Sequence, residues 1–188
     1  MPEQLYYEDI AIGDEITPLV KQPTTRQLVM WAGASGDYNP IHYDKDFAQS
    51  QGLPGVIVQG QLVGCFLGQL ITNWIGEAGI VHSFSCSYRG MNFPGEVLTC
   101  RGKVIKKYIE DDRHYVECDI WVEKPKGEKT VLGRAVVIVP SKGTPFGAPS
   151  IACGVSCLLY TSDAADELDG VDLGGRRIVK KKNLGWRW

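Results

Sequence analysis

A short stretch of the chain, ASGDYNPIHYD at positions 34 to 44, carries two side chains that can transfer protons. Asp37 can accept a proton as a carboxylate, and His42 can donate or accept one near neutral pH. A carboxylate and an imidazole can hold one water molecule between them, and Asn39 can orient either group or a substrate carbonyl without changing its charge. The pattern therefore predicts acid and base chemistry on a water molecule.

Pro40 lies between the two groups and restricts the backbone on both sides. It fixes its own φ angle and disfavours a helical conformation at Asn39. We therefore expect an ordered, non-helical loop with a nearly constant separation between Asp37 and His42. An Asx turn at Asp37 or Asn39 beside an exposed histidine fits the same residues, so both interpretations stay open on residue types alone.

Two helices are predicted on either side of this loop. Thr24 or Thr25 can cap a helix through TRQLVMWAGAS, with Gly36 at its end. The apolar contacts of this helix are expected from Leu28, Met30 and Trp31. A longer helix is predicted over GQLVGCFLGQLITNWIG, at positions 60 to 76, where apolar residues recur in pairs every four positions.

The start of the longer helix is the second candidate site. Its first backbone amides have no partner inside the helix and can hold a carbonyl oxygen that becomes negatively charged. Gly60 has no side chain to obstruct a ligand. A plain helix start with a glycine fits equally well, so this feature depends on the Asp37 and His42 pair for its interpretation.

Alternating apolar residues after position 79 indicate strands. Phe84, Cys86 and Tyr88 alternate, and the segments VLTCRGKVI, HYVECDIWVE and TVLGRAVVIV follow. Turns at NFPGE, IEDD and KPKGE separate these segments into a predicted antiparallel meander. One long helix followed by antiparallel strands predicts an α+β fold in which a curved sheet wraps around the helix.

Composition argues against several other functions. The net charge is −2 and no basic face is apparent, so nucleic-acid binding is not expected. No segment approaches the ~20 apolar residues of a membrane span. The six cysteines are irregularly spaced, without a CxxC pair, which favours reduced, buried thiols in a cytoplasmic protein. There is no glycine-rich phosphate loop, and we interpret His82 and His114 as ordinary strand histidines.

The C-terminal segment differs in composition from the rest of the chain. Residues 157–162 read CLLYTS, which back-translates as TGT CTC TTA TAC ACA TCT and resembles the transposase end sequence of DNA sequencing libraries. The later VDLGGRRI resembles a translated adapter. We therefore expect one domain over 1–145, an extension over 146–156 truncated by the adapter, and a non-native, disordered tail over 157–188.

The stretch GDYNPIHYD resembles the GDxNPxHxD motif of the MaoC-like enzymes, which include (R)-specific enoyl-CoA hydratases and hydroxyacyl-ACP dehydratases. The similarity continues through GLPGVIVQGQL and RGMNFPGEVLTCRGKV. It implies a single hot-dog fold and a homodimer, or a heterodimer with a second hot-dog subunit. It also implies that Asp37 and His42 are the catalytic pair, that Asn39 positions substrate, and that the Gly60 amide is an oxyanion donor.

The implied reaction is hydration of a 2-enoyl thioester of CoA or acyl-carrier protein to a (3R)-3-hydroxyacyl thioester, without a metal or other cofactor. Gln59 departs from the family, which often has histidine before the helix glycine, and we place it with the substrate-binding residues. A non-catalytic or partner-dependent acyl-binding subunit is the alternative. A hot-dog thioesterase is a weaker one, because the loop from Asp37 to His42 has no role in that chemistry.

Overall fold

The structure is a computed structural model that describes residues 4–143 of the 188-residue chain. The expectations for 146–156 and for the tail at 157–188 lie outside the described residues. Among the described residues, no helix combines the length and apolar character needed to cross a membrane.

Five antiparallel strands form one sheet in the order β1-β3-β4-β5-β2. The strands are β1 (Glu15–Lys21), β2 (Ile80–Tyr88), β3 (Leu98–Glu110), β4 (Arg113–Glu123) and β5 (Lys129–Ile138). The helices are α1 (Thr25–Ser35), α2 (Lys45–Ser50) and α3 (Gly60–Ile75), with 3₁₀ turns η1 (Tyr7–Asp9) and η2 (Pro40–His42).

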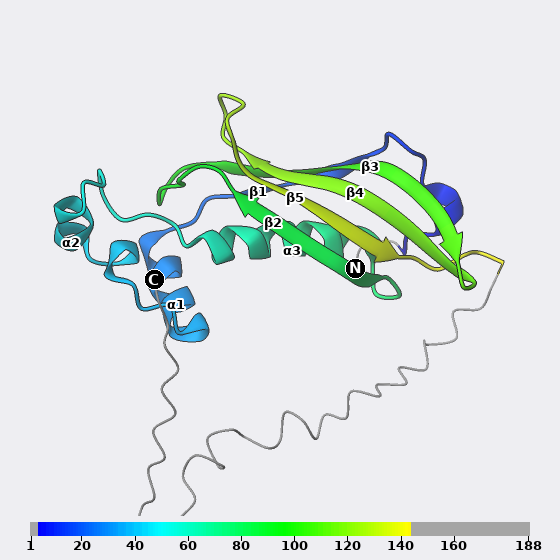
Figure 1. The fold of residues 1–188 in the computed structure, drawn as a ribbon, viewed down its shortest axis with the longest axis horizontal. Coiled ribbons are helices and arrows are strands. Elements are labelled where there is room, and N and C mark those ends of the chain that lie inside the picture. The colour runs from blue at the N-terminus through cyan, green and yellow to red at the C-terminus, as the bar shows by residue number, and fades with distance from the viewer. Residues whose placement is uncertain (1–3, 144–188) are drawn as a thin grey trace, which may run out of the picture. The chain divides into compact units, whose positions relative to one another are not determined.

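The long helix α3 lies along one face of the curved sheet (Figure 1). Its apolar side chains join those of β1, β3, β4 and β5 in one buried cluster, in which Leu67, Ile71 and Val116 are 0% exposed, and β2 contributes only partly buried side chains packed against it. Burial of this apolar surface stabilises the wrapped arrangement. The predicted α+β fold, with a sheet around one long helix, is confirmed, and the helix has the predicted bounds within one residue.

Two glycines allow the sheet to curve at its centre. Gly102 of β3 pairs with Ile16 and Ile120, and Gly133 of β5 pairs with Ile120 and Cys86. A Cβ at Gly102 would lie 2.6 Å from Cδ1 of Ile16, and one at Gly133 would lie 2.4 Å from the Ser85 carbonyl oxygen. Only glycine leaves room for the neighbouring strands at these two positions.

The predicted meander is correct only for β3, β4 and β5. Strand β2 pairs with β5 at the outer edge, so the NFPGE segment connects opposite sides of the sheet. The turn itself is present, because Glu96 donates its amide to the Phe93 carbonyl at 3.2 Å and Gly95 has a φ of 85°. Strand β1 and helix α2 were not predicted.

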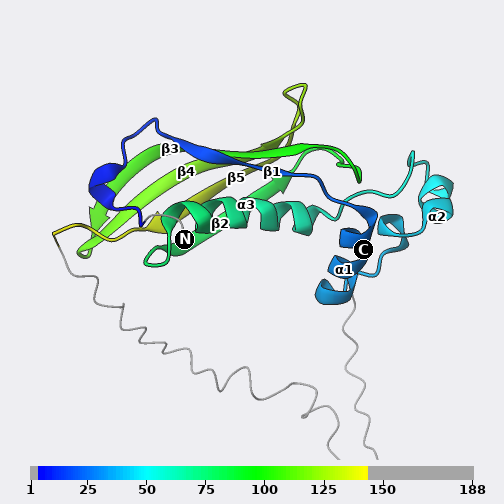
Figure 2. The same ribbon diagram turned by 180° about the vertical axis from the view of Figure 1, so that it is seen from behind.

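Helices α1 and α2 lie together at one end of the sheet, beyond the start of α3 (Figures 1 and 2). Helix α1 begins where expected, since the Thr24 side chain accepts a hydrogen bond from the Gln27 amide, and Gly36 ends it with a φ of 75°. Leu28 is buried as predicted, but Met30 is 63% exposed, so its predicted core contact is wrong. The segment between the two helices contains Asp37 and His42.

Candidate active site

The chain between Asp37 and His42 is held by short-range hydrogen bonds. The Asn39 amide donates to Oδ1 of Asp37 at 3.4 Å, and the Ile41 amide donates to Oδ1 of Asn39 at 3.3 Å. Asn39 thereby caps the 3₁₀ turn η2, with Pro40 at its first position. The expectation of a non-helical loop was therefore wrong for Pro40 to His42, although Asn39 is extended as predicted.

His42 is buried and faces the aspartate. Only 7% of its surface is exposed, and its Nδ1 lies 2.8 Å from the Ile57 carbonyl oxygen. A carbonyl can only accept, so Nδ1 carries the proton in this hydrogen bond. Nε2 then points towards Asp37, 3.6 Å from its Oδ2. The Asx turn at Asp37 is real, but the exposed histidine of the alternative interpretation is not.

Backbone hydrogen bonds join this turn to the start of α3. The Ile57 amide donates to the Ile41 carbonyl at 3.1 Å, beside the hydrogen bond from His42 to the Ile57 carbonyl. The Val58 amide donates to the Asn92 carbonyl at 2.8 Å. Residues 57 and 58 are thus held from two sides, which sets His42 close to the N-terminus of α3.

The first amides of α3 are available to a ligand. Among residues 4–143, no group accepts a hydrogen bond from the amides of Gly60, Gln61 or Leu62, and the Gln59 side chain does not cap the helix. Gly60 is partly exposed, while the Tyr88 ring lies beside it. This end of the helix can therefore stabilise negative charge on an oxygen next to the Asp37 and His42 turn.

Gln59 does not face the solvent. Its side chain is 1% exposed, and Nε2 donates to the Leu28 carbonyl of α1 at 2.9 Å. Its Oε1 is buried and has no hydrogen-bond partner within the described residues. The residue therefore connects α1 to the start of α3, and only Oε1 is free to contact a water molecule or a substrate.

The other residues considered from the sequence lie in different surroundings. The His82 ring packs edge-on against Tyr115, and the His114 ring lies against Tyr7. Ser35 donates to the Trp31 carbonyl at 2.7 Å and accepts from the Asp37 amide, so it supports the loop. Across positions 4 to 143, no three His, Cys, Asp or Glu side chains are grouped as a metal site.

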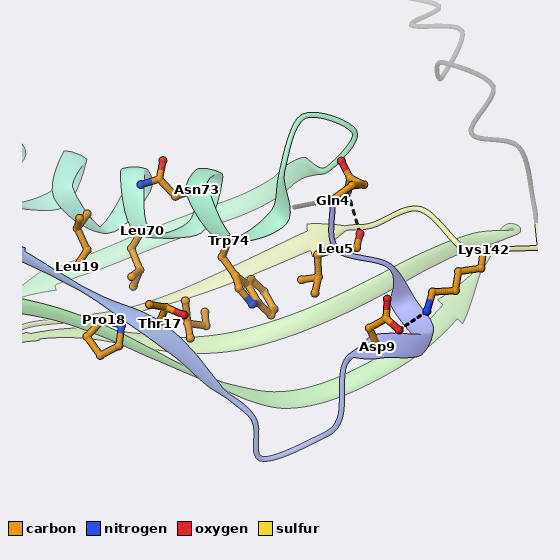
Figure 3. Close-up of a pocket in the computed structure, with 11 residues that line it drawn as sticks. Gln4, Leu5, Asp9, Thr17, Pro18, Leu19, Leu70, Asn73, Trp74 and Lys142 are labelled. Carbon is orange, nitrogen blue, oxygen red and sulfur yellow. Dashed lines mark hydrogen bonds and ion pairs between the residues drawn. The ribbon is translucent and has the colours of Figure 1, made fainter. Parts of the chain in front are cut away.

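A separate cavity of about 850 Å³ lies at the other half of α3. Figure 3 shows Trp74 and Leu70 facing β1 residues across it, with the ion pair of Asp9 and Lys142 at one side. None of its lining residues belongs to η2 or to the first turn of α3. The cavity is therefore distinct from the candidate active site.

Sequence reasoning missed two contributors to the site. The Ile57 carbonyl orients His42, but a backbone acceptor leaves no signal in residue types. Tyr88 lies against the start of α3, and only the alternation of β2 indicated that it faces inward.

Two curated relatives match most of this chain. A fatty acid synthase subunit beta from Aspergillus oryzae is 39% identical over 166 residues, which are 84% of this chain and 8% of that subunit. The chain spans only 4% to 8% of the length of three fatty acid synthase beta subunits that it matches. The (R)-specific enoyl-CoA hydratase of Rhodospirillum rubrum is 26% identical over 73% of this chain and 94% of its own length.

Solved structures share the fold. The R-hydratase PhaJ1 from Pseudomonas aeruginosa superposes with a TM-score of 0.68 at 23% identity, over 74% of this chain and 88% of that one. The sequence profile described as "MaoC like domain" matches residues 10–124. These residues include η2, all of α3 and four of the five strands, so the chain belongs to the MaoC-like domain family, with the hot-dog fold of the R-hydratases.

Proposed function

We propose that this chain catalyses the reversible hydration of a 2-enoyl thioester to a (3R)-3-hydroxyacyl thioester. The observation that carries the proposal is the buried His42, whose Nε2 lies 3.6 Å from Oδ2 of Asp37 beside the free amides at the start of α3. Three requirements of the reaction are a base for water, an acid for the α-carbon and a donor for the thioester oxygen. Each has a group here.

The separation of Asp37 and His42 suits a bridging water. At 3.6 Å the two atoms are beyond a good direct hydrogen bond, and a water molecule beside them can reach both. The Asn39 amide holds Oδ1 of Asp37, which leaves Oδ2 as the oxygen that faces the water. The Ile57 carbonyl holds Nδ1 of His42, so proton transfer takes place at Nε2.

The proton transfers balance in one cycle. The Asp37 carboxylate takes a proton from water as the water oxygen forms its bond to C3 of the enoyl group. The electrons of the double bond move onto the thioester oxygen, and protonated His42 then delivers its Nε2 proton to C2. Transfer of the proton from Asp37 to His42 restores the starting state. Both groups lie on one side of the substrate, so hydroxyl and hydrogen add to the same face.

The start of α3 supports the negative charge between these events. With no acceptor for the Gly60 amide within the described residues, a thioester oxygen placed there receives a hydrogen bond and the field of the helix. A donor placed where charge develops is worth about 10²–10³ in rate. Gln59 contacts α1 and so fixes the position of the Gly60 amide relative to the loop that follows α1.

The relatives support the substrate class. The R. rubrum protein is named an (R)-specific enoyl-CoA hydratase, and a Methylorubrum extorquens relative, 28% identical, is named a 3-hydroxybutyryl-CoA dehydratase. We assign the same thioester chemistry, on CoA or acyl-carrier protein, and the (3R) product to this chain. We also propose a cytoplasmic homodimer, with the open edge of β2 as its contact.

A partner-dependent subunit is the second candidate. Gln59 stands where the family often has histidine, and Phe84 and Tyr88 on the edge strand β2 are 39% and 50% exposed. Both features suit a chain that needs a second hot-dog subunit to complete its site. Hydration that appears only after co-expression with such a subunit would select this candidate.

The test is the loss of the enoyl chromophore when the purified chain is mixed with 2-enoyl-CoA thioesters. We expect loss of ultraviolet absorbance without release of free thiol, and a (3R) product on a chiral column. Release of free thiol would instead indicate a thioesterase. A folded protein that leaves every enoyl-CoA unchanged would contradict the proposal for the isolated chain.

A further inference from the structure

Tyr88 of the edge strand β2 packs directly on the first two turns of α3. A Cβ at Gly60 would lie 3.3 Å from Cδ1 of the Tyr88 ring, and one at Gly64 would lie 2.8 Å from its hydroxyl oxygen. The ring therefore lies along the helix, with its base near Gly60 and its hydroxyl one turn further on. Glycine at both positions is what allows this close approach.

This placement borders the oxyanion donor of the proposed site. The ring atoms closest to Gly60 are carbon atoms, so the wall that they form beside the free amide is apolar. Burial, with smaller contributions from Cys86 and Cys65, raises the pKa of the Tyr88 hydroxyl, which stays neutral at physiological pH. A thioester held by the Gly60 amide would meet an uncharged aromatic surface on this side.

The surface beyond the Tyr88 hydroxyl is open. Gly68 follows Gly64 by one turn on the same side of α3, and a Cβ there would have no neighbour within 4 Å. Phe84, which shares the inward-facing side of β2 with Tyr88, is 39% exposed. The apolar seam between α3 and β2 therefore continues past Tyr88, and the ring occupies the end of the seam beside Gly60.

We propose that Tyr88 limits the length of the acyl group that the site accepts. Its ring closes the end of this seam next to the Gly60 amide. The inference rests on the proposed function for the placement of the thioester. A short acyl group fits between the ring and the Asp37 loop, whereas a longer one needs the space that the ring fills. Removal of the ring opens the seam from Gly60 to Gly68 to the acyl chain.

The test measures binding separately from turnover. Butyryl-CoA and decanoyl-CoA are saturated thioesters that cannot be hydrated, and their Kd values are measured by titration calorimetry with the full chain. In Tyr88→Ala we expect the preference for decanoyl-CoA over butyryl-CoA to rise by roughly tenfold or more, since single methylenes in a fitted pocket change discrimination on that scale. Tyr88→Phe retains the wall and should keep the wild-type preference.

Leu132→Ala is the control, because it removes an exposed apolar side chain from the neighbouring strand β5, on the face of the sheet opposite to the seam. It should leave the preference unchanged. Light scattering on each variant checks that the oligomeric state is constant. An unchanged preference in Tyr88→Ala, or an equal change in Tyr88→Phe, would overturn the inference.

Hydration of crotonyl-CoA in the same preparations separates the two proposals. If the wild type hydrates crotonyl-CoA but Tyr88→Ala does not change the binding preference, the role of Tyr88 is overturned and the enzymatic proposal stands. A binding shift without hydration supports Tyr88 as the acyl wall and overturns the enzymatic proposal for the isolated chain. If neither thioester binds, the chain has no acyl site here, and the inference is overturned.

Discussion

At the scale of single residues, local hydrogen bonds hold the chain between Asp37 and His42. Oδ1 of Asp37 accepts from Asn39, and Asn39 in turn caps the turn that ends at His42. These contacts span two residues each. The pairing of Asp37 with His42 could therefore be predicted from the sequence.

The Gly60 amide can be tested by proline, which removes the amide hydrogen. Gly60 is the first residue of α3, a position that proline favours, and Gln59 has φ −57° and ψ 130°, which suits a residue before proline. We expect Gly60→Pro to lower kcat for enoyl-CoA hydration by about 10²–10³ while the helix is retained. Gly60→Ala is the control, since it adds the Cβ and keeps the amide.

The two variants should differ strongly. In Gly60→Ala the new Cβ lies 3.3 Å from the Tyr88 ring, so a small shift of the ring accommodates it. Circular dichroism checks that both proteins fold. Equal kcat values for the proline and alanine variants would exclude the amide as the oxyanion donor.

Other contacts of the site join residues far apart in the sequence, and these could not be predicted. The Gln59 side chain bonds to Leu28, which lies 31 positions away, and Tyr88 packs on Gly60 from a different strand. Such contacts depend on how the elements pack, and residue types alone do not reveal them. The role of Gln59 was therefore assigned by position alone, and its burial became visible only in the structure.

At the scale of elements, the strength of the periodic signal decided what could be predicted. Helix α3 and strands β3, β4 and β5 have long regular patterns. Strand β1 was missed because Pro18 interrupts it and its register with β3 shifts between Ile16 and Leu19. Helix α2 has only six residues, so its main signal is Asp44, whose side chain caps it through the Phe47 amide.

The glycines of the sheet provide a test of its curvature. A Cβ at Gly133 would lie 2.4 Å from the Ser85 carbonyl oxygen and 3.1 Å from Ile120, so β2 and β4 would have to move. We expect Gly133→Ala to lower the free energy of unfolding by about 1–3 kcal/mol, the usual result of overpacking. Urea unfolding followed by fluorescence measures the change.

Gly33→Ala is the matched substitution in open space. A Cβ at Gly33 of α1 would have no neighbour within 4 Å, and alanine is the better helix former. The free energy of unfolding of this variant should be about 0.5–1 kcal/mol higher than that of the wild type. Equal free energies of unfolding for Gly133→Ala and Gly33→Ala would contradict the close approach of the strands at Gly133.

At the scale of the whole molecule, the two edges of the sheet differ. Strand β1 contains Pro18 and a shifted register, which blunts that edge. Strand β2 pairs with β5 without interruption from Ser83 to Tyr88, and its other side has no partner strand among the described residues. The β2 edge is therefore the one suited to pair with a second copy.

We expect Phe84→Glu to dissociate the proposed homodimer, because it places a charge beside the β2 edge where a second copy would bury the ring. Leu132→Glu is the control: Leu132 is 41% exposed, close to the 39% of Phe84, and pairs with Ser87 on the opposite face of the sheet. Sedimentation measures the mass of each variant. Equal masses for wild type and Phe84→Glu would argue against this interface.

Two buried thiols make the free energy of unfolding depend on pH in the alkaline range. Burial raises the pKa of Cys100 and of Cys118 to about 12, from the ordinary thiol value of 9.0. The folded state thus favours the neutral thiol, so this contribution is fully present below pH 9 and is lost as the pH rises towards about 12. At a pH near ~10.5, each thiol should account for about 1–2 kcal/mol of lost stability.

The double variant Cys100→Ala and Cys118→Ala isolates this effect. Alanine does not titrate, so the decline in unfolding free energy from neutral to alkaline pH should be smaller than in the wild type. Tyrosines and lysines titrate in both proteins and cancel in the comparison. Parallel pH profiles for the two proteins would show that the thiols are not the cause.

The measurement that tests the central claim most directly is the rate of enoyl-CoA hydration by Asp37→Asn, with Asp44→Asn as its control. Asp44 lies in the same segment and caps α2, a role that asparagine can keep. We predict that Asp37→Asn lowers kcat by about 10²–10⁴ with little change in KM, and that Asp44→Asn behaves as the wild type. A rate for Asp37→Asn within a few-fold of the wild type would contradict the assignment of Asp37 and His42 as the catalytic pair.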